Sequence, residues 1–347
     1  MKAYIALFRQ QFLSRLQYRA AFWSQVITSI FWAYVHTAII AMFYRFGSGT
    51  SSLTLRQAIA FIWLKEIAFT LLPGIGMNMD VWGRICKGEV AYDLVRPLDL
   101  YGHWYFSELS ARLAPFLTAI APLLLAALVT PGELGLRLTA APLSFLAGLI
   151  TLSTGVLFSC AVTCLSYAMC MDVRVGHAPA NMFLLVVQVL AGSILPLQLW
   201  PDSMQRFLAM QPFAGLMDLL LRFLVGSAAL SELPHVLTLQ AFWGALIVLL
   251  PLLYAFLSAF WGLFLNLKRP SLTWTSEIAP IKQSLPTALA LFGSWAYSIL
   301  LAGGYFLLRR FLPAAAYLAL FSAVTAVCAA LLYRWVCTRG AKIFAAL

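Results

Sequence analysis

Eight apolar stretches limit what this chain can fold into. A helix that crosses a membrane needs about 20 predominantly apolar residues, because the hydrocarbon core offers no hydrogen-bond partner to free backbone groups. Stretches of this kind cover residues 21–44, 57–76, 106–130, 141–169, 180–198, 239–265, 285–308 and 314–335. The sequence therefore predicts an all-α, polytopic integral membrane protein with about eight transmembrane helices.

Composition supports a membrane protein and argues against a soluble one. Of the 347 residues, 63% are hydrophobic and only 10% are charged, whereas soluble domains carry about 25% charged residues. The net charge is +11, but the basic residues form no continuous tract that would follow a phosphate backbone. We therefore expect the lipid bilayer as a partner and no nucleic acid.

Residues 1–20 predict an amphipathic helix. Four apolar residues recur at helical spacing, and basic residues occupy the other faces. The apolar residues are Tyr4, Phe8, Phe12 and Leu16, and the basic ones are Lys2, Arg9 and Arg15. This pattern is typical of a helix in the cytoplasmic membrane interface, although a cytoplasmic extension of the first span has the same orientation. The following apolar stretch is too long for a signal-peptide core, so we expect an uncleaved anchor.

The positive charges predict the orientation, because Lys and Arg flanking membrane spans collect on the cytoplasmic side. With the N-terminus inside and eight spans, 15 of the 23 basic residues fall in internal segments and seven in external ones. The internal group includes Arg84, Lys87, Arg96 and Arg112. We therefore expect both termini to be cytoplasmic.

Residues 77–100 form a charged island between two apolar stretches. Seven charged residues lie here: Asp80, Arg84, Lys87, Glu89, Asp93, Arg96 and Asp99. Apolar residues recur between them at helical spacing, and Pro97 pushes Arg96 out of the α region. The pattern predicts a short amphipathic helix that ends at Arg96. One interpretation is a solvated loop that only orients the protein; the other is a surface helix that docks a soluble subunit.

The second apolar stretch contains two adjacent charged residues, Lys65 and Glu66. Ionisable residues within spans are costly and usually face a bundle interior or a cavity. Adjacent residues do not face each other on a helix, so we expect each to have a partner elsewhere. A functional role and an interfacial structural role both remain open for this pair.

Residues 195–226 are too apolar for an ordinary loop and too interrupted by Pro196, Pro201 and Pro212 for one spanning helix. We expect two short helices that enter the outer leaflet and return, packed against protein. A polar, proline-rich stretch then begins near residue 266. The sequence thus predicts an interfacial helix (1–20), a six-span core (21–265) and a two-span extension (266–347).

The sequence contains none of three common motifs for nucleotide binding, nucleophilic catalysis or zinc-dependent hydrolysis. It contains no G-x-x-x-x-G-K-[ST], no G-x-S-x-G and no H-E-x-x-H. The four histidines are far apart, and none of the six cysteines forms a C-x-x-C pair. We therefore assign no catalytic residue, metal site or cofactor to this chain.

Two segments carry a resemblance to a known family. The stretch GEVAYDLVRPLDL resembles a "G-E-(x)n-L-x-R-P-(x)-(D/N)" segment of a six-span subfamily of ABC-2 export permeases, the membrane subunits of ATP-binding cassette transporters. The matching residues are Gly88, Glu89, Leu94, Arg96, Pro97 and Asp99. Residues 199–226 resemble the outer re-entrant element of that subfamily, with Trp200, Pro201, Gln211, Pro212, Phe213 and Gly226 at matching places.

This resemblance covers residues 1–262, and residues 263–347 look more like the last two spans of larger bacterial ABC export permeases. It implies that residues 80–97 act as a coupling helix for an ATPase subunit. The residues concerned are Asp80, Arg84, Lys87, Gly88, Glu89, Asp93, Arg96 and Pro97. It also implies a bacterial inner-membrane exporter in which two ATPase subunits bind ATP and Mg²⁺, and this chain pairs with itself or a sister permease.

The resemblance leaves the substrate open, although an apolar and aromatic pathway suits an amphipathic lipid, drug or peptide. Two other classes of function also remain open. One is an ion-driven secondary transporter, for which Glu66, Glu108 and Asp218 are the candidate carboxylates. The other is a membrane-embedded transferase, whose nucleophile or metal site is not visible in the sequence.

The predicted topology can be tested with single cysteines and a membrane-impermeant thiol reagent. We expect labelling from outside at Ser48, Leu230 and Phe311, and from inside at Val90, Ser276 and Ala345. External labelling at Ala345 would contradict the eight-span arrangement with cytoplasmic termini.

Overall fold

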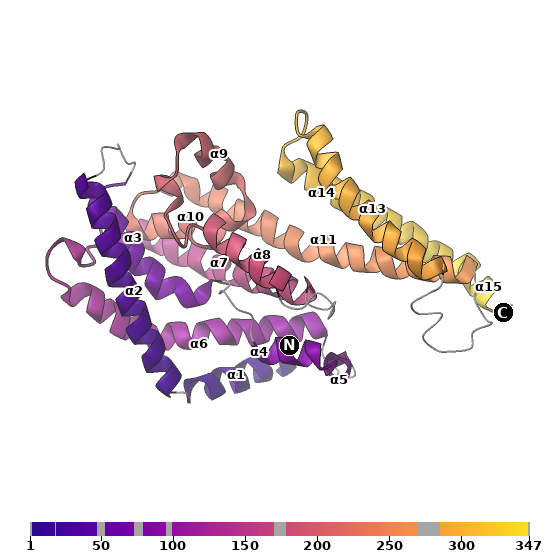
Figure 1. Ribbon diagram of the computed structural model, residues 1–347, viewed down its shortest axis with the longest axis horizontal. Helices are drawn as coiled ribbons and strands as arrows, with labels where there is room; N and C mark the ends of the chain where they lie inside the picture. The colour runs from indigo at the N-terminus through magenta and orange to yellow at the C-terminus, as the bar shows by residue number, and fades with distance from the viewer. Residues whose placement is uncertain are drawn as a thin grey trace. The chain divides into compact units, whose positions relative to one another are not determined.

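A computed structural model describes residues 2–17, 19–46, 53–72, 79–94, 99–169, 178–268 and 285–345. Every regular element within these ranges is a helix (Figure 1). Six segments are long and apolar enough to cross a membrane: Phe22–Phe46, Leu100–Val129, Pro142–Ala168, Leu230–Lys268, Ala288–Leu308 and Ala316–Phe344. The predicted all-α class is confirmed, and the chain fits a multi-pass membrane protein.

The chain divides into two compact units, residues 1–244 and 245–347. The first half of the first unit contains α1 (Lys2–Leu16), α2 (Arg19–Phe46), α3 (Leu55–Ala68), η1 (Phe69–Leu71), α4 (Met79–Cys86), α5 (Val90–Leu94), α6 (Leu100–Val129) and η2 (Gly132–Leu134). Its second half contains α7 (Pro142–Met169), α8 (Ala178–Leu190), η3 (Leu197–Leu199), α9 (Asp202–Met210), η4 (Pro212–Leu216), α10 (Asp218–Val225), η5 (Leu230–Glu232) and the start of α11 (Leu233–Lys268).

Two of the expected spans form shorter helices. α3, within the expected span 57–76, has 14 residues, and α8, within 180–198, has 13. At 1.5 Å per residue each is about 20 Å long, against a hydrocarbon core of about 30 Å. α3 continues as the 3₁₀ turn η1, and a turn follows α8 at Gly192. The length of an apolar stretch thus overestimates the length of these two helices, because apolar residues continue beyond the point where each helix ends.

α1 packs along the first half of α6. The Tyr4 hydroxyl donates a hydrogen bond to Asp99, and its ring stacks on Phe106 with centroids 5.2 Å apart. Further along both helices, Ser110 Oγ donates to Gln11 Oε1 at 3.2 Å. The two helices therefore run side by side in the same direction (Figure 1). α1 buries no residue fully, as expected for a helix packed on one face; its interfacial location stays a prediction.

Residues 195–226 contain two short helices, α9 and α10, as predicted. Pro201 is the N-cap of α9, and Pro212 begins η4 between the two helices. Gly226 ends α10 with φ +76°, where an added Cβ would come within 2.9 Å of Ala140 Cα, so glycine is required on two counts. α10 is buried against α7 and α3. The location of this segment in the outer leaflet stays a prediction.

The second unit contains the C-terminal part of α11, α13 (Leu285–Leu308), α14 (Ala314–Trp335), the π-helical segment η6 (Val336–Gly340) and α15 (Ala341–Phe344). Aromatic rings join its helices. Tyr254 of α11 lies 4.6 Å from Tyr297 of α13, and Phe264 lies 4.6 Å from Trp335 of α14, between ring centroids. These contacts explain why the boundary falls within α11 and not in the polar stretch after residue 266.

Two adjacent residues of α9 provide a test of its packing. Leu208 is 1% exposed and belongs to an apolar cluster with Phe223 and Val236, whereas the neighbouring Phe207 is 63% exposed. We expect Leu208→Lys to lower the free energy of unfolding by about 3–5 kcal/mol, because the charge would be buried without a partner. Phe207→Lys should leave stability nearly unchanged. Thermal unfolding of the purified variants in detergent measures this difference, and equal midpoints would contradict the packing of α9.

Candidate functional site

The charged island forms two short helices instead of one. α4 ends at Cys86 and α5 begins at Val90, with a turn between them in which Gly88 has φ +72°. The single helix expected up to Arg96 is therefore wrong. A positive φ is strained for any residue with a Cβ, so Gly88 interrupts the helix that the apolar spacing alone predicts.

One face of these two helices packs onto the first unit. Val81 and Ile85 of α4 and Val90 of α5 are buried in one apolar cluster. The same cluster contains Trp104 of α6, Cys164 and Tyr167 of α7, and Ala180 and Leu184 of α8. The apolar pattern of the island predicts that Val90 and Leu94 pack against the bundle; Val90 does so, and the side chain of Leu94 lies outside what the structure describes. The α4–α5 segment thus shares one buried apolar cluster with residues of α6, α7 and α8.

An ion pair joins α4 to α5. Arg84 Nη2 lies 2.5 Å from Asp93 Oδ1, and Asp93 is 3% exposed. Two of the eight residues expected at an ATPase contact, Arg84 and Asp93, thus pair with each other across the turn. Because Asp93 is buried, removing Arg84 would take away a cation that compensates its charge.

The outer face of the segment carries Lys87, Glu89 and Tyr92. Lys87 and Tyr92 are exposed, Tyr92 at 73%, and Glu89 is half-buried. Tyr92 is not among the residues predicted from the sequence, although an aromatic residue within a charged island is a recognisable signal for a protein interface. Among the remaining predicted residues, Asp80 lies in α4, and Arg96 and Pro97 lie outside the described residues.

Lys65 and Glu66 form a buried cluster with His36 of α2. Lys65 Nζ lies 2.8 Å and His36 Nδ1 lies 3.0 Å from the same carboxylate oxygen, Glu66 Oε1. Lys65 Nζ is also 3.2 Å from His36 Nδ1. The expectation that the adjacent charges need separate partners is therefore wrong. Their long side chains reach a common point although their Cα atoms point in different directions, and His36 adds the partner from another helix.

A second buried pair joins α6 to α7 and to the end of α3. Arg112 Nη2 lies 3.5 Å from Glu108 Oε2 and donates to Thr163 Oγ1 of α7, while Nη1 donates to the Leu72 carbonyl. Tyr167 donates to Glu108. Arg112 was counted as a cation of an internal loop segment, but it is 5% exposed within the bundle. The i,i+4 spacing of Glu108 and Arg112 is the signal that identifies the pair.

A third pair, within α10, also holds the start of η3. Arg222 Nη2 lies 2.5 Å from Asp218 Oδ2, and the Leu197 amide donates to Asp218 Oδ1 at 2.8 Å. Asp218 is fully buried. Each of the three carboxylates considered for ion coupling thus has a cation within 3.5 Å.

A polar cavity of about 470 Å³ opens beside the first of these clusters. Helices α2 and α3 and the end of α8 line it, and Lys65, Glu66 and His36 form part of its wall. Its other polar lining groups are hydroxyls and amides: Ser24, Gln25, Thr28, Ser29, Gln188 and Ser193. Trp32 and Phe69 supply aromatic surface. The volume falls within the range of about 300–1,000 Å³ that holds small molecules.

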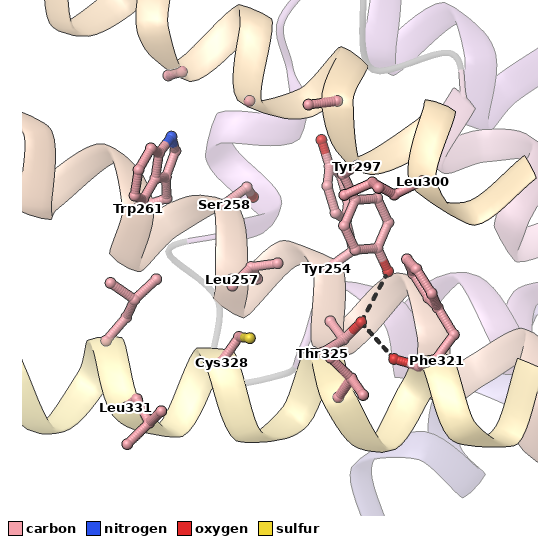
Figure 2. Close-up of a pocket in the computed structure, with 15 residues that line it drawn as sticks. Tyr254, Leu257, Ser258, Trp261, Tyr297, Leu300, Phe321, Thr325, Cys328 and Leu331 are labelled. Carbon is pink, nitrogen blue, oxygen red and sulfur yellow. Dashed lines mark hydrogen bonds between the residues drawn. The ribbon is translucent and has the colours of Figure 1, made fainter. Parts of the chain in front are cut away.

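A second cavity, of about 800 Å³, lies within the second unit and is almost entirely apolar. Figure 2 shows it between α11, α13 and α14, with Tyr254, Trp261, Tyr297 and Phe321 around it. Its polar contacts are few; Thr325 Oγ1 donates to the Phe321 carbonyl at 2.8 Å and lies 3.4 Å from the Tyr297 hydroxyl. Such a cavity offers apolar surface to an acyl chain but few directional contacts for selecting a ligand.

Comparisons of the chain with protein-family models, curated proteins and solved structures find no match. Within the described residues, no three His, Cys, Asp or Glu side chains come together in a way that would hold a metal ion. The functional argument therefore depends on the α4–α5 segment, the buried charge clusters and the two cavities.

The packing of α1 against α6 includes a titratable contact, between Tyr4 and Asp99, that lies outside the apolar spans. The hydrogen bond from Tyr4, together with the Gly102 amide at 2.6 Å, lowers the pKa of Asp99 below its usual value, and the same bond raises the pKa of Tyr4. A lowered carboxyl pKa stabilises the folded form above the unfolded pKa of about 3.8. That contribution is lost as the pH falls through the lower, folded pKa.

We therefore expect Tyr4→Phe to increase hydrogen exchange of the α1 amides at pH 7 and pH 5. The difference from wild type should shrink only as the pH falls below about 3.8 and through the lowered, folded pKa of Asp99. Gln10→Leu, on an exposed position of α1, serves as the control. Unchanged exchange in Tyr4→Phe at pH 7 would show that the Tyr4–Asp99 contact does not hold α1.

Proposed function

We propose that this chain is the membrane-spanning permease subunit of an ABC exporter and that α4 and α5 receive the movement of a separate ATPase. The observation that carries the proposal is that the two faces of these helices differ: one is apolar and buried, and the other is charged, aromatic and exposed. Val81, Ile85 and Val90 face the bundle, while Lys87 and Tyr92 face outward. A segment with one anchored face and one free, charged and aromatic face fits a docking element.

The proposed mechanism requires α4 and α5 to move together with α6, α7 and α8. The Arg84–Asp93 pair closes the turn between α4 and α5, and the apolar cluster joins both to α6, α7 and α8. Closure of an ATPase against the outer face would thus displace these helices as a rigid body. Export would follow as alternating access between two half-transporters, with ATP and Mg²⁺ bound by the two ATPase subunits.

The proposal retains eight membrane crossings, both termini in the cytoplasm and a bacterial inner membrane. Within the part of the chain that the structure describes, six helices are long enough to cross by themselves. The two additional crossings would use α3 with η1 and α8 with the α9–α10 segment. Interrupted helices are tolerated at membrane depth where they pack against protein, and α3 and α10 are almost completely buried.

An ion-driven secondary transporter is the second candidate function, and the His36–Glu66–Lys65 cluster is the observation that favours it. A proton carrier requires a carboxylate that alternates between charged and neutral forms. Glu66, Glu108 and Asp218 are each already paired with a cation of the same helix. These pairs suit a structural role better than proton transport. A membrane-embedded transferase remains the third alternative.

Coupling predicts that changes on the outer face weaken the complex without affecting the fold. We expect Tyr92→Ala and Glu89→Ala to reduce co-purification of the proposed P-loop ATPase subunit and to lower ATP hydrolysis by the reconstituted complex. Loss of a buried interface aromatic or of one partner in a desolvated charge pair costs about 2–5 kcal/mol in binding. Membrane insertion and thermal stability should be unchanged.

Matched controls are available in an exposed acidic residue and an exposed aromatic residue away from α4 and α5. Glu133 has a side chain 66% exposed, and Phe46 is 81% exposed. Glu133→Ala and Phe46→Ala should retain full ATPase binding. Undiminished binding and hydrolysis in both Tyr92→Ala and Glu89→Ala would contradict the docking function and leave the segment as an orientation signal.

A further inference from the structure

The apolar cavity of the second unit is elongated along the helices that line it. On α14 its lining residues run from Phe321 to Leu332, which corresponds to about 16 Å of helix. Figure 2 shows Phe321 at one end of the cavity and Trp261 and Leu331 at the other. The volume of about 800 Å³ is therefore a long apolar space between α11, α13 and α14, which suits an acyl chain.

The Trp261 end of the cavity lies next to the place where the ends of α11 and α14 meet. Phe264, one turn beyond Trp261 on α11, lies 4.6 Å from Trp335 of α14 between ring centroids. One turn further, Leu267 packs on η6, where a Cβ added at Gly340 would come within 3.0 Å of its Cδ1 atom. The end of α11 and the segment that follows α14 are therefore in contact just beyond this end of the cavity.

A basic cluster surrounds this contact. Its four side chains are all exposed: Lys268, Arg334, Arg339 and Lys342. The first three are each adjacent in the sequence to one of the contact residues Leu267, Trp335 and Gly340. The described residues of the second unit include no Asp or Glu, so no carboxylate within this part of the unit neutralises the cluster. Unpaired basic groups at the end of a membrane span attract anionic lipid headgroups.

Basic residues at the opposite end of the unit lie farther from the cavity. Arg309 and Arg310 are in the turn between α13 and α14. The last lining residue of α13 is Leu300, and Arg309 follows it by about 14 Å of helix. Arg334, by contrast, follows the lining residue Leu332 by two positions. The positive charge close to the cavity is therefore concentrated at its Trp261 end.

We propose that the second unit binds one anionic phospholipid, with an acyl chain in the apolar cavity and the phosphate at the basic cluster. The cavity alone would accept any acyl chain, because it offers few directional contacts. Arg side chains beside its end would select the headgroup, since guanidinium groups donate charge-assisted hydrogen bonds to phosphate oxygens. A second copy of the chain fits this place less well, because the same unit of that copy would bring further positive charge and no described carboxylate.

Lipid binding is measured on the full-length chain in detergent, by native mass spectrometry with dioleoyl phosphatidylglycerol or dioleoyl phosphatidylcholine. We expect one phosphatidylglycerol molecule to be retained at a concentration about tenfold lower than phosphatidylcholine needs, because only the former is anionic. The double variant Lys268→Gln/Arg334→Gln should lose this preference. The matched control Arg309→Gln/Arg310→Gln removes the same charge at the opposite end of the unit and should keep it.

Two valines of α14 test the cavity. Val324 lines it and is 53% exposed, whereas Val327 is 59% exposed and lies outside the lining. We expect Val324→Trp to weaken retention of phosphatidylglycerol about tenfold, because the indole takes space in which the chain would be buried. Val327→Trp should leave retention unchanged. Cys328→Trp changes a second lining residue and provides the same test if Val324→Trp does not fold.

Four results would overturn the proposal. Equal retention of the two lipids by the wild type would show that the headgroup is not selected, and equal losses in the two double variants would assign the preference to net charge alone. Undiminished retention in Val324→Trp and Cys328→Trp would place the acyl chain elsewhere. A change of oligomeric state in Val324→Trp without a change in lipid retention would show that a second copy occupies the cavity. None of these results depends on an ATPase, so they are independent of the coupling experiment.

Discussion

The pairing of buried charges is the constraint on which the first unit depends. Among the described residues, the buried carboxylates are Glu66, Asp93, Glu108 and Asp218, and each lies within 3.5 Å of a Lys or Arg side chain. Removing one partner from such a pair costs about 3–5 kcal/mol, because the remaining charge stays buried without compensation. These positions are therefore fixed relative to one another far more firmly than apolar contacts alone would require.

The same charged residues connect different helices. Apolar packing alone would not fix the positions of these helices along one another. Glu66 brings α3 to His36 of α2, Arg112 joins α6 to α7 and to the carbonyl of Leu72, and Asp218 holds the amide of Leu197 beside α10. Side-chain hydrogen bonds are directional, whereas contact between apolar surfaces tolerates a shift of one turn. The charged groups thus fix the position of each short helix along its neighbours.

The packing of the first unit links the α4–α5 segment to the polar cavity. The α4–α5 segment rests on α6, α7 and α8, and the end of α8 supplies Gln188 and Ser193 to the polar cavity. Movement at the outer face of α4 and α5 would therefore reach the cavity through α8. The cluster that the segment shares with these helices contains Trp104 and Tyr167 in edge-to-face contact, with ring centroids 5.6 Å apart.

The sequence alone determined the helical membrane class, the position of the charged island and the two short helices between residues 195 and 226. These features depend on local properties: apolar length, helical periodicity and the effect of proline on the backbone. The break at Gly88 was missed because apolar spacing continues across it, and Tyr92 was missed because its exposure depends on which face packs. Only the tertiary structure joined Lys65 and Glu66 to His36 and placed Arg112 inside the bundle. The physical reason is that the partners of a buried charge come from other helices, and the sequence does not say which helices meet.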